Sequence, residues 1–136
     1  MNTPCFYRIS VKGIVIDDNG RFLLAKETNG KWSMLGGGLE HGEQPIEGLK
    51  REVMEEAGLE ITYVSKTPLY FIVGPSDRNI GENTANIIYE IKLNSLNFKP
   101  SDECQELKFF NVKEAQDLKM YPKVKQFLNE YDSTIR

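Results

Sequence analysis

The stretch from Pro45 to Gly58 constrains the fold of this chain more than any other segment, because it has the pattern of one amphipathic helix. Pro45 suits the first turn of a helix, where its missing N–H costs nothing, and Gly58 suits a C-terminal cap. Apolar residues recur between them at helical spacing: Ile46, Leu49, Val53 and Ala57. The sequence therefore predicts a helix over Pro45 to Ala57 with one face packed in the core.

Short runs rich in β-branched and apolar residues surround this helix and predict strands. They cover residues 7–16, 22–25, 61–64, 69–73, 86–93 and 107–110. Between the first two runs lies Asp17-Asp18-Asn19-Gly20, a turn signal because Asn-Gly tolerates positive φ. We therefore expect the first two strands to form a hairpin.

Two further helices are expected near the end of the chain. Asn111 and Glu114 have the spacing of a capping box, which opens a short helix. Pro122 opens a last helix. Its apolar residues share one face: Val124, Phe127, Leu128 and Tyr131. Strands before, between and after helices predict an α/β fold, an α/β/α sandwich around a mixed β-sheet.

Length and composition limit the class of protein. The chain has 136 residues, 40% of them hydrophobic, which predicts a single domain over residues 1–136. Seventeen basic and 20 acidic residues give a net charge of −3, which offers no basic face for a nucleic-acid polymer. No stretch approaches the ~20 apolar residues of a membrane span, and residues 1–7 hold no signal-peptide run. A cytoplasmic protein with two reduced cysteines, Cys5 and Cys104, is expected.

The polar side of the predicted helix gathers three carboxylates. Glu52, Glu55 and Glu56 stand at i, i+3 and i+4, so their side chains share one face and repel one another. Clustered hard oxygen ligands favour Mg²⁺ or Mn²⁺ as the compensating cation. Arg51 can pair with Glu55 and can also reach back to Glu43, and its rigid guanidinium would hold these acids in place.

The glycines and acids together resemble the Nudix box, the signature of a family of pyrophosphohydrolases. The matching positions are Gly37, Glu43, Arg51, Glu52, Val53, Glu55, Glu56, Gly58 and Leu59, so the box spans residues 37–59. The resemblance implies a Nudix-type sandwich and a Mg²⁺-dependent hydrolase, with Mn²⁺ as a substitute. The implied substrate is a small nucleotide derivative whose pyrophosphate bond is cut to give a nucleoside monophosphate and a phosphorylated product.

The resemblance also implies residue roles. Glu52, Glu55 and Glu56 would bind metal together with the backbone carbonyl of Gly36, and Arg51 with Glu43 would be the orienting pair. Glu40 would support the loop or the metal cluster. Backbone at Gly37 and Gly38 can approach phosphate closely, since glycine has no side chain.

The general base is expected either in the helix or in a later loop. Of the loop acids Glu103 and Glu106, the first is preferred, because its distance ahead of Asn111 resembles the family loop. Arg78 lies in a polar connection long enough to fold over a substrate, where it would contact phosphate; an ordinary hairpin loop is the alternative.

Several alternatives stay open at this point. A Nudix-fold domain can sense a nucleotide without hydrolysing it, although such domains usually lose box acids and this chain keeps them. Pro75, sixteen residues beyond Leu59, suggests ADP-ribose as another substrate. Trp32 and Tyr7 suit either stacking on a base or packing in the core. The sequence leaves the nucleotide, the number of metal ions and the oligomeric state open, a homodimer included.

Overall fold

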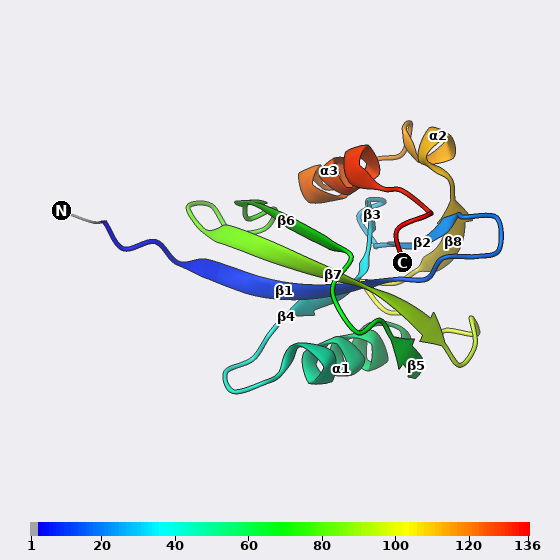
Figure 1. The fold of residues 1–136 in the computed structure, drawn as a ribbon, viewed down its shortest axis with the longest axis horizontal. Helices are drawn as coiled ribbons and strands as arrows, with labels where there is room; N and C mark the ends of the chain where they lie inside the picture. The colour runs from blue at the N-terminus through cyan, green and yellow to red at the C-terminus, as the bar shows by residue number, and fades with distance from the viewer. Residues whose placement is uncertain (1–2) are drawn as a thin grey trace.

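Figure 1 shows the computed structural model of the chain, which describes residues 3–136. Met1 and Asn2 belong to the predicted domain range 1–136 but lie outside the described residues. The strands are β1 (Tyr7–Ile14), β2 (Phe22–Lys26), β3 (Trp32–Ser33), β4 (Leu35–Gly38), β5 (Ile61–Val64), β6 (Tyr70–Pro75), β7 (Asn83–Leu93) and β8 (Glu106–Phe110). The helices are α1 (Pro45–Ala57), α2 (Val112–Ala115) and α3 (Pro122–Glu130).

The strands form two β-sheets, which lie between the helices. The larger has five strands in the order β4-β1-β7-β5, with β6 also paired to β7, and the smaller has the order β3-β2-β8. Strands β1 and β7 run parallel, and every other pairing within the two sheets is antiparallel. The larger sheet is therefore mixed, as predicted.

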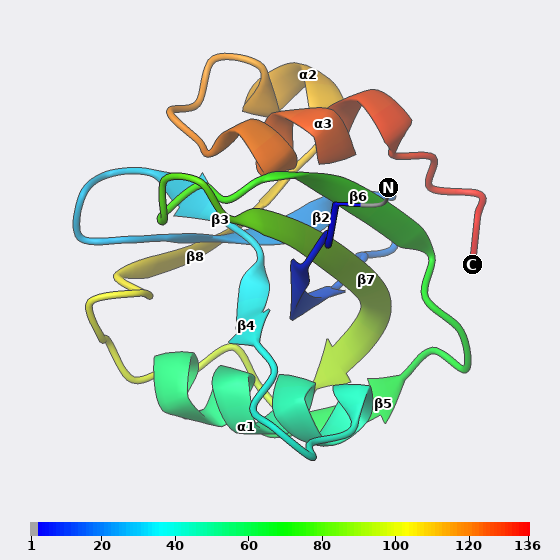
Figure 2. The same ribbon diagram turned by 90° about the vertical axis from the view of Figure 1, so that its left-hand side faces the viewer.

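Helices cover both sides of these sheets, with α1 on one side and α2 and α3 on the other (Figures 1 and 2). Each side has its own hydrophobic core. Leu49 and Val53 of α1 pack with Val11 of β1 in one core, while Val124 and Phe127 of α3 belong to the other. The α/β/α sandwich expected from the order of strands and helices is confirmed.

Local signals predicted both ends of α1 and the start of α2 correctly. Helix α1 runs from Pro45 to Ala57, and the N–H of Gly58 donates to the carbonyl of Met54 to cap it. At α2, the side chain of Asn111 accepts from the N–H of Glu114, and the Glu114 side chain accepts in return. The capping box is therefore present as predicted.

Two expectations were wrong in part: the hairpin of the first two strands, and the burial of Ile46 on the apolar face of α1. The turn after β1 forms, since the Gly20 N–H donates to the Asp17 carbonyl at 3.0 Å, but β1 and β2 then enter different sheets. The predicted hairpin is present only next to the turn, where the bridge from Ile16 to Phe22 is flanked by a hydrogen bond from the Leu23 N–H to the Val15 carbonyl. On α1, Ile46 is 39% exposed, because the buried stripe begins one turn later at Leu49.

Trp32 belongs to the core and Tyr7 does not. The Trp32 ring packs edge-on against Phe110, with ring centroids 5.0 Å apart, whereas Tyr7 is largely exposed. Cys5 and Cys104 are free thiols, as expected. Within residues 3–136, no helix is long and apolar enough to cross a membrane.

Candidate active site

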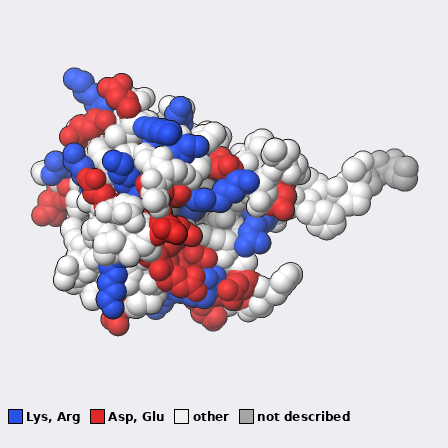
Figure 3. All heavy atoms as spheres, turned by 180° about the vertical axis from the view of Figure 1, so that it is seen from behind, with Lys and Arg blue, Asp and Glu red and all other residues white. Residues whose placement is uncertain are grey.

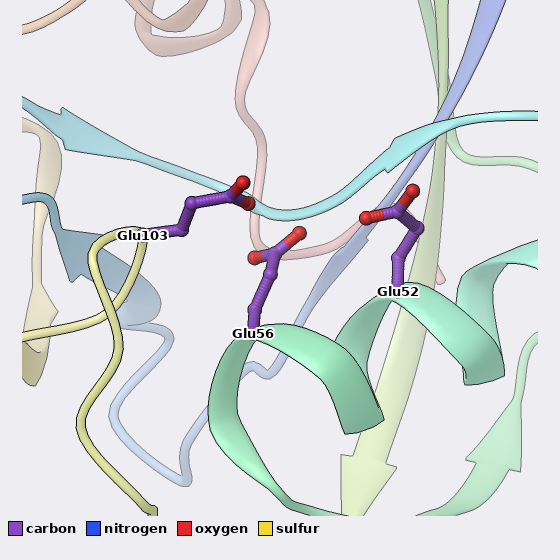
Figure 4. A group of neighbouring side chains, drawn as sticks. All are labelled: Glu52, Glu56 and Glu103. Atoms are coloured by element: carbon purple, nitrogen blue, oxygen red, sulfur yellow. The ribbon is translucent and has the colours of Figure 1, made fainter.

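Three glutamates from two distant segments converge above the C-terminal half of α1 (Figure 4). Glu52 and Glu56 point up from consecutive turns of the helix, and Glu103 reaches toward them from the loop before β8. One carboxylate oxygen of each lies within 4.8 Å of the others. Such a set of hard oxygen donors suits a small divalent cation such as Mg²⁺ or Mn²⁺.

The loop that carries Glu103 is fixed on both sides of this residue. The carbonyl of Asp102 accepts from the N–H and the hydroxyl of Thr28, at 2.9 and 2.6 Å. Cys104 is fully buried in the core beside α1. The hydroxyl of Ser101 also donates to the Glu56 carbonyl at 2.5 Å, which ties the loop to the end of the helix. The backbone thus presents Glu103 to the helix acids.

Two glycines of β4 let the sheet approach these acids. Gly36 has φ of +118°, and a Cβ there would lie 2.1 Å from the Val11 carbonyl oxygen. A Cβ on Gly37 would lie 2.7 Å from the carboxylate of Glu52. Any larger residue would push β4 away from β1 or from α1. The N–H of Gly36 donates to Glu56 at 3.3 Å, so its backbone lies beside the cluster.

Arg51 is the centre of an ion-pair network at the start of the site. It donates to both carboxylate oxygens of Glu43, at 2.7 and 2.9 Å, and to the carbonyl of Gly38 at 3.1 Å. It also contacts Glu52 at 3.1 Å and Glu55 at 3.2 Å. The hydrogen bonds from Arg51 lower the pKa of Glu43 to about 2. The reach of Arg51 to Glu43 and Glu55 that the spacing suggested is therefore present.

Glu56 is the one box acid that is buried, with 6% of its surface exposed. Its pKa is raised to about 9, mainly by burial; Lys12 acts in the opposite direction, and the negative charges of Glu103 and Glu52 add to the rise. Its side chain lies in the carboxylate cluster, where β4 and the loop that carries Glu103 cover the end of α1.

A cavity of about 530 Å³ opens above Glu52 and Glu103. Its floor is made by neighbouring strands in register: Arg8 and Ser10 of β1 lie opposite Thr84 and Asn86 of β7. Gly36, Gly37 and Gly38 line its edge. On the face shown in Figure 3, the largest gathering of acidic atoms runs from the centre to the lower edge of the molecule, with basic atoms beside it. The cavity lining itself combines carboxylates with cations, among them Glu52 and Glu103 with Arg8 and Lys12.

Asn86 and Thr84 bring unused hydrogen-bonding groups to this floor. Asn86 is 5% exposed and Thr84 8%, yet neither side chain hydrogen-bonds to another group in the described part of the chain. No fully enclosed side-chain N or O atom lacks a partner within that part. The polar atoms of these two side chains therefore open into the cavity, where a ligand can bond to them.

The far wall of the cavity is organised by Glu27, whose side chain is 8% exposed. Its carboxylate accepts from the hydroxyls of Tyr121 at 2.7 Å and Ser33 at 3.1 Å, and from Arg78 at 2.9 Å. The Arg78 guanidinium also lies over the Tyr121 ring, 5.0 Å from its centroid. Three segments far apart in sequence are thus held together by one buried acid.

Other predicted site residues lie outside the carboxylate cluster. The Glu55 side chain is 59% exposed beside Arg51, and the Glu40 side chain is 68% exposed, 3.7 Å from the same guanidinium. Glu106 is exposed at the start of β8. Gly37, Gly38 and Arg78, the residues predicted to contact substrate, line the cavity.

Sequence reasoning missed Lys12, Glu27 and Asn86. Each of them interrupts an apolar strand or follows one directly, which is the signal that could have identified them.

Comparison with known proteins places most of the chain in one protein family. The profile of the NUDIX domain family matches residues 6–131. A MutT-like protein of Streptomyces ambofaciens is 38% identical over 69 residues, which are 50% of this chain and 45% of that protein. The nucleoside triphosphatase NudI of Enterobacter sp. (strain 638) is 33% identical over 85 residues, which are 58% of this chain and 60% of that protein. The chain thus spans 45% and 60% of the length of these curated relatives.

Solved structures share the fold over nearly the whole chain. The MutT protein from Methanosarcina mazei Go1 has a TM-score of 0.75 at 21% identity and covers 95% of both chains. The MutT NUDIX hydrolase from Burkholderia pseudomallei has a TM-score of 0.76 at 20% identity, covering 93% of this chain and 99% of that one. At this level of identity the similarity shows the fold.

Proposed function

The chain belongs to the Nudix family, and from that premise we propose that it is a Mg²⁺-dependent pyrophosphohydrolase that acts on nucleotides. The substrate is a nucleoside triphosphate or a nucleoside-diphosphate-linked compound, and one product is a nucleoside monophosphate. The observation that carries the proposal is the convergence of Glu52, Glu56 and Glu103 at one end of a polar cavity. The relative that is named a nucleoside triphosphatase favours a triphosphate.

The donor set fits a divalent metal. Glu52 and Glu56 would hold it with the carbonyl of Gly36, whose N–H donates to Glu56, while Glu103 faces the same position from the loop before β8. Hard carboxylate and carbonyl oxygens are the ligands that Mg²⁺ and Mn²⁺ prefer. A bound metal would neutralise the pyrophosphate and make a nearby water more acidic. Glu55 would become a further metal ligand only if its ion pair with Arg51, 3.2 Å long, were broken.

Glu103 is the residue we propose as general base. Its carboxylate is exposed to the cavity, whereas Glu56 is buried with a pKa of about 9. A water oxygen forms a new bond to phosphorus, and the bond from phosphorus to the bridging oxygen breaks. Glu103 accepts the proton of that water, and the bridging oxygen leaves with the second product as a phosphate.

The remaining box residues position these groups. Arg51 and Glu43 form a bidentate pair that holds the N-terminal half of α1 against the carbonyl of Gly38. Such a rigid pair keeps the metal ligands within the narrow range of positions that catalysis needs. We assign Glu40 the support of this loop, because its N–H donates to Glu43 at 3.0 Å.

Substrate contacts are assigned to the cavity beyond the carboxylates. Gly37 and Gly38 offer backbone to the phosphates, and Arg78 contributes positive charge from the opposite wall. Asn86 can donate and accept hydrogen bonds at the edge of a base or sugar. Its position two strands away from the Gly36–Gly38 edge, with β1 between, supports a role in recognising the nucleoside rather than the phosphates.

Two alternatives have less support. The suggestion of ADP-ribose rests on Pro75, and here its carbonyl accepts a hydrogen bond of 2.5 Å from Lys123, so this residue has a structural contact of its own. A sensor that binds without hydrolysis would have no need for Glu103 to face the helix acids, and the box acids are intact.

A substrate panel tests the proposed function. The purified protein is incubated with Mg²⁺ and with nucleoside triphosphates, deoxynucleoside triphosphates, nucleotide sugars and ADP-ribose, and products are separated by ion-exchange chromatography. We expect a nucleoside monophosphate and pyrophosphate from one or more triphosphates. Tight binding of a nucleotide without turnover of any compound would instead support the sensor, and turnover of ADP-ribose alone would support the alternative substrate.

A further inference from the structure

Lys12 of β1 reaches across the sheet to the backbone of the candidate metal site. Its ammonium donates to the carbonyl oxygen of Gly36 at 2.9 Å. Lys12 and Gly36 are register partners on the antiparallel strands β1 and β4. Because Gly36 has no side chain, its backbone can lie directly against that of Val11 and Lys12 in β1. The carbonyl that we assign to the metal is therefore bonded by a cation of the protein itself.

The same ammonium also compensates the acids. The N–H of Gly36 bonds Glu56, so the two ends of one residue connect Lys12 to the carboxylate cluster. The positive charge of Lys12 counteracts the rise in the pKa of Glu56. Arg51, which also contacts Glu52, is already bonded to Glu43. Lys12 is thus a second cation beside the cluster, bonded to Gly36 rather than to an acid.

We propose that Lys12 competes with the divalent metal for the Gly36 carbonyl, and that metal binding releases its ammonium toward the phosphates of the substrate. The inference rests on the proposed metal site and adds a positioning residue to it. Lys12 lines the same cavity as Gly37 and Gly38, so its free ammonium stays within the space assigned to the phosphates. The ammonium of Lys12 leaves the Gly36 carbonyl when the metal ion binds there.

This exchange has two measurable consequences. Removing Lys12 removes a competitor, so the metal binds more tightly in the absence of substrate, by about tenfold if one charge-assisted hydrogen bond is no longer displaced. Removing it also removes a phosphate contact, so KM for the nucleotide rises. A residue with a merely structural role would weaken both interactions when it is replaced.

Mn²⁺ alone, without nucleotide, is the probe of choice. Binding is measured by electron paramagnetic resonance for the wild-type chain, for Lys12→Met, and for Lys125→Met as a control that removes one exposed lysine from α3. We expect the Kd for Mn²⁺ to fall about tenfold in Lys12→Met, in line with the bond that is removed, and to stay unchanged in the control. If Lys12→Met does not fold, Lys12→Gln, which keeps a polar side chain, takes its place.

The outcomes separate this inference from the proposed function. A wild-type chain that binds no Mn²⁺ would refute the metal site and the competition with it. A wild-type chain that binds Mn²⁺, with unchanged or weaker binding in the Lys12 variant, would refute the competition and leave the metal site standing. Tighter Mn²⁺ binding together with a raised KM for the nucleotide would support both parts of the inference.

Discussion

The substitution Glu56→Gln should stabilise the metal-free protein at neutral pH. Glu56 is 6% exposed, and burial raises its pKa from 4.5 to about 9. At pH 7 the folded chain therefore keeps this carboxyl protonated, whereas the unfolded chain ionises it. Stability of the metal-free protein is lost as the pH rises from about 4.5 toward 9, because the unfolded state releases a proton that the folded state retains.

The loss of stability at pH 7 depends on how far this pH lies above the pKa of Glu56 in the unfolded chain. The interval from the unfolded pKa of 4.5 to pH 7 is about 2.5 units, which corresponds to a cost of about 3 kcal/mol. Glutamine has no such cost, and its side-chain oxygen can still accept from the Gly36 N–H. Glu56→Gln is thus expected to gain up to about 3 kcal/mol at pH 7 and almost nothing at pH 4.5.

Urea unfolding in excess chelator at pH 5 and pH 7 measures this effect. Glu47→Gln serves as the control, because Glu47 is exposed on the same helix. Saturating Mg²⁺ should reverse the order of stability, since only the wild-type chain keeps the ligand that ionises on metal binding. Equal stability of wild type and Glu56→Gln at pH 7 without metal would refute the reasoning.

Three further substitutions, together with Glu106→Gln as a control, address the other roles. Glu103→Gln should lower kcat by ~10²–10⁴, the range for losing a general base, while Glu106→Gln stays near wild type; the reverse order in an assay at saturating Mg²⁺ would exclude Glu103 as the base. Glu55→Gln should lower kcat by ~10², the scale for losing a charge-stabilising group, and a fully active variant would remove Glu55 from the metal site. Asn86→Ala should raise KM by about tenfold through one lost hydrogen bond, with the melting temperature nearly unchanged; an unchanged KM for every nucleotide would show that the amide contacts no substrate.

Much of the fold could be predicted because local signals act within a few residues. Pro45 and Gly58 end α1 through backbone geometry, and Asn111 and Glu114 satisfy each other's N–H groups. The alternation of strands and helices then limits how the layers can stack. The hairpin after β1 was overestimated, because a turn fixes the reversal of the chain but does not determine which sheet each strand enters.

The site was harder to predict, because its central contacts are long-range. The spacing of Glu52 and Glu56 placed them on one helix face, but the approach of Glu103 depends on the burial of Cys104. Glu56 is buried by β4 and by the loop before β8. The spacing of residues within α1 therefore could not predict its burial. The bond from Lys12 to a backbone carbonyl depends on strand register, which the sequence does not specify.

The most direct test of the account is the metal dependence and position of the cleavage. The preferred nucleoside triphosphate is incubated with the protein in excess chelator and then with increasing Mg²⁺, and the products are identified by ³¹P nuclear magnetic resonance. We predict no turnover in chelator, and a nucleoside monophosphate with pyrophosphate once Mg²⁺ is present. Full turnover in chelator, or release of a nucleoside diphosphate and inorganic phosphate, would contradict a metal-dependent pyrophosphohydrolase built on these carboxylates.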